Sequence, residues 1–331
     1  MDSAISGKTY LITGGASLIG SHVTDQLLEA GAKEVRLFDN YSLGTPDTIA
    51  HLDGHPKVKA IRGDILRLNE LLDACKGVDG VFALAGFLTL PMSQNPPLGV
   101  AVNTIGMVNV MEAARIQGVG RVIFSSSVSA YGTTQADALS EDVGFTTAGQ
   151  QPVASLYGST KLLGEALGKL YTQKYGVQFN ALRFSSVYGE RQHARAVNAV
   201  YIAQVYDQVR SGERPVIVGD GSEVHDYIYV TDVAAGCLAA MTNGTHGETF
   251  NIVTGVDTSL TQVVQAVLEL CKSGLEPEYR EDQRAVRSAS VARLAFDPAK
   301  AKRVLGWTPK VSVKEGIRRY IDWRKSLPGG H

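Results

Sequence analysis

The sequence lacks several features that mark common classes of protein. Its 331 residues include only three cysteines, which lie far apart without a CxxC pair or other metal-ligand spacing. We therefore expect buried thiols in a reducing compartment and no metal site. A GxSxG motif is also missing, so nothing indicates a serine nucleophile with a histidine base.

An excess of one charge and long apolar runs are missing as well. The formal net charge of −1 gives no reason to expect nucleic acid or an anionic membrane as a partner. Nowhere do about 18 apolar residues run together, and the first residues lack the basic flank and apolar stretch of a signal peptide. With 44% apolar and 20% charged residues, the chain has the composition of a soluble globular protein. Since it lacks these targeting and membrane signals, we expect it to be cytoplasmic.

The first half of the chain alternates short apolar runs with amphipathic segments. The runs predict strands over residues 9–13, 34–39, 58–62, 81–84, 122–125 and 179–183. Helical spacing occupies residues 18–30, 100–117 and 154–175. Such repeated alternation predicts a parallel sheet covered by helices on both faces.

The second half is less regular. Helices are expected over residues 197–210, 231–241 and 260–272, with a short strand at 216–218. Thr231 and Ser259 are candidate caps for the last two helices. The stretch 276–297 is polar and rich in arginine, which predicts a loop.

A glycine-rich turn, Thr13-Gly-Gly-Ala-Ser-Leu-Ile-Gly20, separates the first strand from the first helix. A dinucleotide pyrophosphate would rest there, on N–H groups at the helix N-terminus. Gly14 permits the tight turn and Gly20 permits close packing of helix on strand. The predicted contacts are Gly14, Ser17, Leu18, Ile19 and Gly20.

An acidic residue, Asp39, closes the second strand about 20 residues after this turn. A carboxylate there accepts both ribose hydroxyls of NAD and repels the 2′-phosphate of NADP. Asn40 follows it, and no arginine stands nearby to receive a phosphate. The order of strand, glycine turn, helix, strand and acid predicts NAD as cofactor.

Three further segments are candidates for cofactor contacts. Asp64-Ile65 follows the third strand, where the acid would face the adenine amino group or cap the next helix. Leu84-Ala85-Gly86 would let a cofactor approach closely, or is a plain strand-end turn. Asn103 lies in a helical pattern, either as a surface residue or as a hydrogen-bonding group near the cofactor.

Tyr157 and Lys161 lie four residues apart in a predicted helix and therefore share one face. A tyrosine normally titrates near pH ~10. A neighbouring ammonium favours the phenolate, which would suit a proton shuttle in alcohol–ketone interconversion. Ser125 and Ser127 end the fifth strand, at the edge where such sheets bind ligands.

Together, these residues resemble the extended short-chain dehydrogenase/reductase family, in its NAD-dependent epimerase/dehydratase group. The resemblance covers nearly the whole chain and includes TGGxxxIGSH (13–22), SSSVSAYG (125–132), YGSTK (157–161), LRFSSVYG (182–189) and DYIYVTD (226–232). It implies that Tyr157 is the general base and acid, with Ser127 as its hydroxyl partner. Lys161 would lower the tyrosine pKa and bind the nicotinamide ribose.

The resemblance also implies the architecture and the assembly. It implies a Rossmann-like, doubly wound α/β domain that binds NAD, with a smaller C-terminal α/β lobe for a sugar nucleotide. The expected boundaries are 1–185 with 226–254 for the first, 186–225 with 255–327 for the second, and a tail at 328–331. Relatives pair through two long helices, so we expect a homodimer formed by segments 100–117 and 154–175.

Departures from the family pattern favour one reaction but leave several substrate classes open. Val128 and Ser129 stand where dehydratases carry acids, so we predict a nucleotide-sugar 4-epimerase acting through a keto sugar. The alternative is an NAD-dependent dehydrogenase of another hydroxylated molecule. Ser17 replaces a glycine of the turn. The predicted substrate contacts are Ser127, Ser186 in place of an asparagine, His225 in place of an arginine, and Arg284 or Arg287.

Overall fold

The computed structural model describes residues 4–192, 200–281 and 295–327. Its centre is a seven-stranded sheet in the order β10-β6-β5-β4-β1-β2-β3, and every neighbouring pair is parallel. The strands are β1 Thr9–Thr13, β2 Glu34–Asp39, β3 Val58–Arg62, β4 Gly80–Ala83, β5 Arg121–Ser127, β6 Gln178–Phe184 and β10 Glu248–Ile252. This confirms the predicted doubly wound α/β fold.

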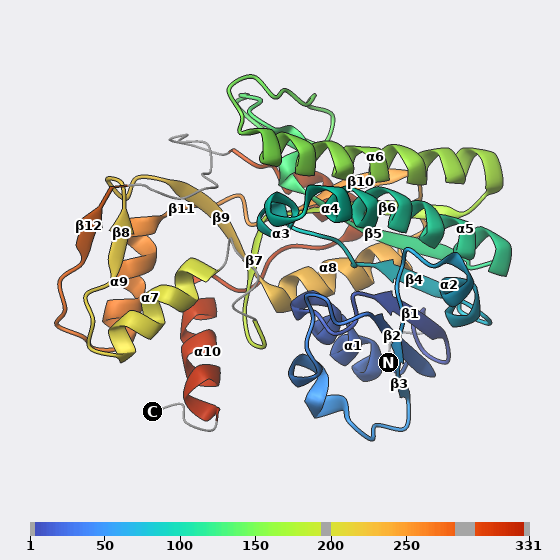
Figure 1. Cartoon of the computed structure of the whole chain (residues 1–331), viewed down its shortest axis with the longest axis horizontal. Coiled ribbons are helices and arrows are strands. Elements are labelled where there is room, and N and C mark those ends of the chain that lie inside the picture. Colours follow the sequence, from blue (N-terminus) through green and yellow to red (C-terminus); the bar gives the residue numbers. More distant parts are fainter. Residues whose placement is uncertain (1–3, 193–199, 282–294, 328–331) are drawn as a thin grey trace.

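Helices cover both faces of the sheet (Figure 1). One face carries α1 (Leu18–Glu29) and α8 (Val230–Thr242), which pack on a core that includes Val23 and Phe250. The other face carries α2 (Leu68–Ala74), α5 (Met107–Gln117) and α6 (Pro152–Tyr175), over a second core. The sheet is therefore buried on both sides, as its continuous apolar strands require.

A smaller part of the molecule lies beyond the end of this sheet, at the left of Figure 1. It holds a three-stranded sheet, β11-β9-β7, and a two-stranded sheet, β12-β8. Its strands are β7 Ser186–Tyr188, β8 Val216–Val218, β9 Val224–Tyr229, β11 Asp257–Ser259 and β12 Glu278–Arg280. Helices α7 (Val200–Arg210), α9 (Leu260–Leu270) and α10 (Val313–Ser326) enclose a third core with them.

Short helical segments complete the described chain. They are η1 Pro46–Leu52, α3 Thr89–Gln94, α4 Pro96–Ala101, η2 Val102–Gly106, η3 Val128–Tyr131 and η4 Ala301–Leu305. Across residues 4–192, 200–281 and 295–327, no helix has both the length and the apolar character that a bilayer span needs.

The structure corrects some local predictions. The helix expected over 100–117 contains a π-helical turn at Val102–Gly106. Thr231 is not a cap, because α8 begins one residue earlier and its N-cap Tyr229 makes no side-chain cap bond. Ser259 does cap α9, in a reciprocal capping box with Gln262.

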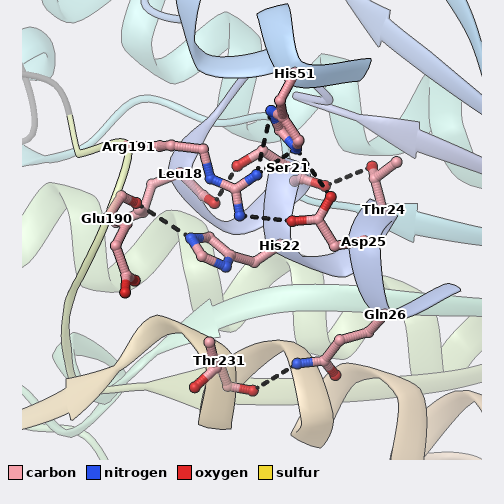
Figure 2. A network of polar contacts seen from close by, with 11 residues as sticks. Leu18, Ser21, His22, Thr24, Asp25, Gln26, His51, Glu190, Arg191 and Thr231 are labelled. Carbon is pink, nitrogen blue, oxygen red and sulfur yellow. Dashed lines mark hydrogen bonds and ion pairs between the residues drawn. The ribbon is translucent and has the colours of Figure 1, made fainter. Parts of the chain in front are cut away.

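A polar network joins α1 to the segment that follows β7 (Figure 2). Arg191 donates to an Asp25 carboxylate oxygen at 2.7 Å and contacts the His51 ring. The His22 ring lies 3.2 Å from the Glu190 carbonyl oxygen. Burial, reinforced by the Arg191 charge, lowers the pKa of His22 to about 4. These contacts tie the first helix to the chain that follows β7.

Candidate active site

A cleft opens at the carboxyl ends of the central strands, next to the point where the strand order reverses between β1 and β4. In doubly wound sheets this is the place where ligands bind. The cleft holds about 540 Å³ of empty space that is continuous with solvent. Nine predicted cofactor contacts line it: Gly14, Ser17, Asp39, Asn40, Asp64, Ile65, Leu84, Ala85 and Gly86.

Two glycines give the turn its shape. Gly14 has φ of +72°, and a Cβ on it would lie 2.9 Å from the Ala85 backbone nitrogen. A Cβ on Gly20 would lie 2.5 Å from the Gly14 carbonyl oxygen. Any larger residue at either position would push the turn away from the sheet. Leu18, Ile19 and Gly20 form the first turn of α1 and are not among the residues that line the cleft.

Ser17 turns out to be the N-cap of α1. Its hydroxyl accepts from the Gly20 N–H at 3.2 Å and donates to the Gly14 carbonyl at 2.6 Å. The side chain is therefore folded onto the turn while it still lines the cleft. A serine replaces the glycine here without closing the site, because its hydroxyl satisfies helix-terminal groups.

Asp39 lies at the end of β2 with both carboxylate oxygens engaged by the backbone. One accepts from the Ala16 N–H at 3.0 Å and the other from the Tyr41 N–H at 2.8 Å. Burial raises the pKa of the Asp39 carboxyl, and these two N–H groups oppose the rise. The carboxylate is held in one orientation at the edge of the cleft, as a ribose-binding acid requires.

The structure decides two of the alternatives that the sequence leaves open. Asp64 does not cap α2, whose N-cap is Arg67; it lines the cleft and accepts from the Leu66 N–H at 2.9 Å. Asn103 is buried and is not a surface residue. Its amide exchanges hydrogen bonds of 2.7 and 3.0 Å with the Phe87 backbone, next to the β4 end.

The three predicted catalytic residues lie at the junction of α6 and β5. Lys161 lines a small hollow beside the cleft together with Asn103. Its Nζ atom lies 5.6 Å from the centroid of the Tyr157 ring, so the predicted shared face is confirmed. The Ser127 hydroxyl lies close enough to the Tyr157 phenol to lower the phenol's pKa, while burial raises it. Lys161 also donates to the Ser125 carbonyl at 2.8 Å.

The predicted effect of the lysine on the tyrosine is wrong for the chain taken by itself. Burial raises the pKa of Tyr157 to about 12, and only the Ser127 hydrogen bond opposes it. Burial likewise lowers the pKa of Lys161 to about 8, against the pull of Glu165. Helical spacing predicts that the two groups are close, but it does not predict that both lose their contact with water.

The predicted substrate contacts are only partly brought together. Ser186 begins β7 and His225 lies on β9, and these two strands are neighbours. The His225 Nε2 atom lies 2.7 Å from a Glu223 carboxylate oxygen, and both side chains are mostly buried. Arg284 and Arg287 lie outside the described residues.

Sequence reasoning missed several residues of the cleft. They are Phe38, Ser42, Leu43, Gly44, Gly63, Phe87 and Val102. Two of them are glycines near predicted acids, since Gly63 directly precedes Asp64 and Gly44 lies five residues after Asp39. A Cβ on Gly44 would lie 2.7 Å from the Ala16 carbonyl oxygen, and one on Gly63 would overlap the Phe38 ring.

Comparison with known proteins agrees with this geometry. The sequence pattern of the NAD-dependent epimerase/dehydratase family matches residues 10–253. The chain belongs to this family. It is 33% identical to a UDP-glucose 4-epimerase of Mycolicibacterium smegmatis, over 95% of this chain and 97% of that protein. The family relationship confirms the resemblance that the motifs indicate.

Solved structures of family members superpose closely on this chain. A UDP-glucose 4-epimerase from Thermotoga maritima, crystallised with UDP-glucose, has a TM-score of 0.84 at 31% identity, covering 97% of this chain and all of its own. A Thermus thermophilus UDP-glucose 4-epimerase, in complex with NAD, has a TM-score of 0.82 at 28% identity, over 96% of this chain and all of its own.

The cofactor of this family member is NAD. The residues in the cleft fit it, because the space beside Gly14 and Gly20 is too tight for a Cβ and Asp39 stands fixed at the end of β2. Gly86 adds a third close approach, since a Cβ there would lie 3.3 Å from Asn103 Oδ1 and 3.4 Å from Lys161 Nζ.

Proposed function

We propose that this protein is a nucleotide-sugar 4-epimerase that acts through a transient keto sugar. Tyr157 takes the proton of the sugar hydroxyl and later returns it, while Ser127 shares a hydrogen bond with the phenol. Bound NAD supplies a hydride acceptor that is regenerated within each turnover. Lys161 holds a positive charge beside the phenol.

The observation that carries this proposal is the composition of the turn after β5. The Ser127 side chain lies close enough to the Tyr157 phenol to lower its pKa, whereas Val128 and Ser129 occupy the positions where dehydratases of the family are expected to carry acids. The Ser129 hydroxyl accepts from Ser127 Oγ at 3.2 Å. Tyr157 can therefore transfer a proton at a sugar hydroxyl, but the turn after β5 carries no acid for the elimination of water.

The raised pKa of Tyr157 sets a requirement on this mechanism. A phenol with a pKa of about 12 is a poor base near neutral pH. Positive charge beside it favours the phenolate. Lys161 and the oxidised ring of bound NAD are the two sources, so we expect the pKa of Tyr157 to fall when NAD binds.

One assay separates epimerisation from the alternative dehydrogenase activity. The enzyme is incubated with UDP-glucose, and both the 4-epimer and the absorbance of NADH are followed. An epimerase forms the epimer without accumulating NADH, whereas a dehydrogenase accumulates NADH in proportion to product. The His225–Glu223 pair is the observation that favours the dehydrogenase. An imidazole bound to a carboxylate lacks the permanent charge with which an arginine would bind the diphosphate of a nucleotide sugar.

The nucleotide is a separate question, which concerns the smaller part of the molecule. We propose that residues 186–225 with 255–327 bind the substrate and that residues 1–185 with 226–254 bind NAD. The separate core built around Tyr188, Tyr206 and Ile217 supports a second lobe, but it also contains Tyr227 and Tyr229, so the expected boundary at residue 226 falls inside β9. UDP-, dTDP- and GDP-sugars are compared by thermal shift, since a ligand that binds only the folded state raises the melting temperature. A panel without any shift would exclude nucleotide sugars.

A homodimer formed by α5 and α6 is the assembly that we propose. Leu163 and Leu170 lie seven residues apart on α6 and are about half exposed, as is Ile116 on α5. Such a stripe of apolar side chains suits helix–helix contact. Leu170→Glu should shift the protein to a monomer in sedimentation. Val256→Glu, at an equally exposed apolar position elsewhere, is the control and should not.

A further inference from the structure

The side chain one helical turn beyond Lys161 also contacts the end of β5. Ser126 Oγ donates a 2.5 Å hydrogen bond to Glu165 Oε1. Lys161 holds the carbonyl of the preceding residue, Ser125, at 2.8 Å. Residues four apart share a helix face, so α6 presents Tyr157, Lys161 and Glu165 to the strand end as one row.

Glu165 is itself fixed by a buried arginine. Arg183 Nε lies 2.9 Å from Glu165 Oε1, and Arg183 Nη2 lies 2.8 Å from Glu165 Oε2. The two side chains are 6% and 5% exposed. Arg183 lies directly opposite Ser126 in the β5–β6 register. A two-pronged ion pair in this setting allows the carboxylate only one orientation.

The same arginine reaches the turn on the other side of Ser127. Its guanidinium lies 4.7 Å from the centroid of the Tyr131 ring in η3. The Tyr131 hydroxyl donates to Asn251 on β10 at 2.7 Å. The strand that leads into Ser127 and the turn that leads out of it are therefore both held by one buried group.

We propose that Glu165, held by Arg183, is a positioning residue for the reaction: it fixes the end of β5 so that Ser127 and Lys161 face Tyr157 in the reactive arrangement. Those of the experiments below that measure turnover rest on the proposed epimerase function. Charge acts in the same direction as geometry, because the Glu165 carboxylate raises the pKa of Lys161 against the effect of burial.

The other titratable groups around this pair are few in the described chain. Tyr157 lies on the same helix, Tyr131 lies on η3, and Glu141 follows in the loop, where it influences Arg183 and Tyr131. The Glu141 carboxylate accepts from the Asn251 N–H at 2.7 Å and is thus already engaged, so Glu165 can be tested alone.

The first test is Glu165→Gln, assayed by turnover of a nucleotide sugar. We expect kcat to fall about 100-fold, the effect of a misplacement of about 1 Å, with KM and NAD affinity nearly unchanged. The alkaline limb of the kcat profile should also move to lower pH, because Lys161 loses its proton more readily without the carboxylate. Glu112→Gln is the control: this carboxylate bonds Tyr171 and Arg115 outside the site, and kcat should not change.

Two further variants separate positioning from stability. Ser126→Ala keeps the ion pair and removes only its bond to the strand, so kcat should fall by less, about tenfold. Glu165→Leu with Arg183→Met replaces the buried pair by apolar groups, a change that often preserves folding. This double variant should be stable and still slow. Full kcat in the stable double variant would overturn the proposal, because a purely structural pair would have been replaced.

A final arm needs no substrate. Protein labelled with ¹³C at the lysine ε-carbon is titrated by NMR, and the Lys161 signal is assigned by its loss in Lys161→Met. The Lys161 midpoint should lie lower in Glu165→Gln than in the wild type, and an unmoved midpoint would contradict the proposal. If the wild type turns over no nucleotide sugar, the proposed function fails while this titration still decides the role of Glu165.

Discussion

The cofactor cleft and the smaller part of the molecule, which we propose binds the substrate, use their polar residues differently. At the cofactor cleft, groups from several strand ends face one space, and nine of the predicted contacts line it. On β9 of the smaller part, His225 is bound to Glu223, and Asp226 accepts from Ser185 and from the Thr254 and Gly255 N–H groups. In the cleft, polar groups face a common space that a ligand can occupy. In the smaller part, the polar groups bond mainly to one another.

This difference follows from how each side is built. The cofactor cleft arises from short turns that follow strands, so its residues are close in sequence to the elements that place them. The substrate side depends on β9 pairing with β7 and β11, which lie far apart in sequence. We therefore expect changes at the catalytic centre and the cofactor cleft to have larger effects than changes on the substrate side.

The largest expected effect is at Tyr157, the proposed proton shuttle. Tyr157→Phe should lower kcat about 1,000-fold, within the range for loss of a general acid–base group, while NAD binding changes little. Tyr171→Phe on the same helix is the matched control, since that hydroxyl bonds Glu112 away from the cleft. Steady-state kinetics and NAD titration measure both. Full activity in Tyr157→Phe would show that another group carries the proton.

The next effect is on cofactor affinity. Asp39→Asn should weaken NAD binding about 100-fold, because hydrogen bonds to a charged group contribute about 1.5–3 kcal/mol each and the amide also faces backbone N–H groups. Isothermal titration with NAD measures this. Asp73→Asn, at an exposed acid on α2, should leave the affinity as it is. Equal affinities in the two variants would remove Asp39 from the site.

A smaller effect is expected on the substrate side. His225→Ala should raise KM for the nucleotide sugar about tenfold, the loss of roughly one hydrogen bond, and leave kcat and NAD affinity unchanged. His246→Ala is the control for removal of an imidazole. An unchanged KM would show that His225 pairs only with Glu223 and does not contact the substrate. The polar groups of the smaller part would then differ even more from those of the cofactor cleft.

The smallest effect concerns stability behind the cleft, in the network of Figure 2. Burial lowers the pKa of His22 to about 4, so between this value and its usual 6.5 the unfolded chain binds more protons than the folded one. The free energy of unfolding should therefore fall as the pH is lowered through that range, by at most about 1.4 kcal/mol for each pH unit. His22→Gln should flatten this dependence in urea titrations at pH 7 and pH 5. An equal slope in both proteins would contradict the assignment.

Much of the fold was predictable because its signals are local. Strands β1, β2 and β3 have the predicted bounds, since each is an apolar run closed by a turn or an acid. Strand β10 was not predicted. It joins the sheet beside β6, although more than sixty residues separate Phe184 from Glu248, and no local pattern specifies that pairing.

The same limit applies to the site. The spacing of Tyr157 and Lys161 predicted their shared face, but their pKa shifts depend on burial by β5 and η2, which spacing does not contain. Glu165 carries no motif of its own, and its role follows only from meeting Ser126 and Arg183 across the β5–β6 register. Chemistry that depends on local turns was predictable, and chemistry that depends on long-range burial was not.

The most direct test of the central claim follows the hydrogen at the reacting carbon. UDP-glucose deuterated at C4 is converted by the enzyme in ordinary water, and the product is analysed by mass spectrometry and NMR. If Tyr157 moves only the hydroxyl proton and the hydride returns to the same sugar, the 4-epimer keeps its deuterium and NADH does not accumulate. Loss of the deuterium to water would contradict this account.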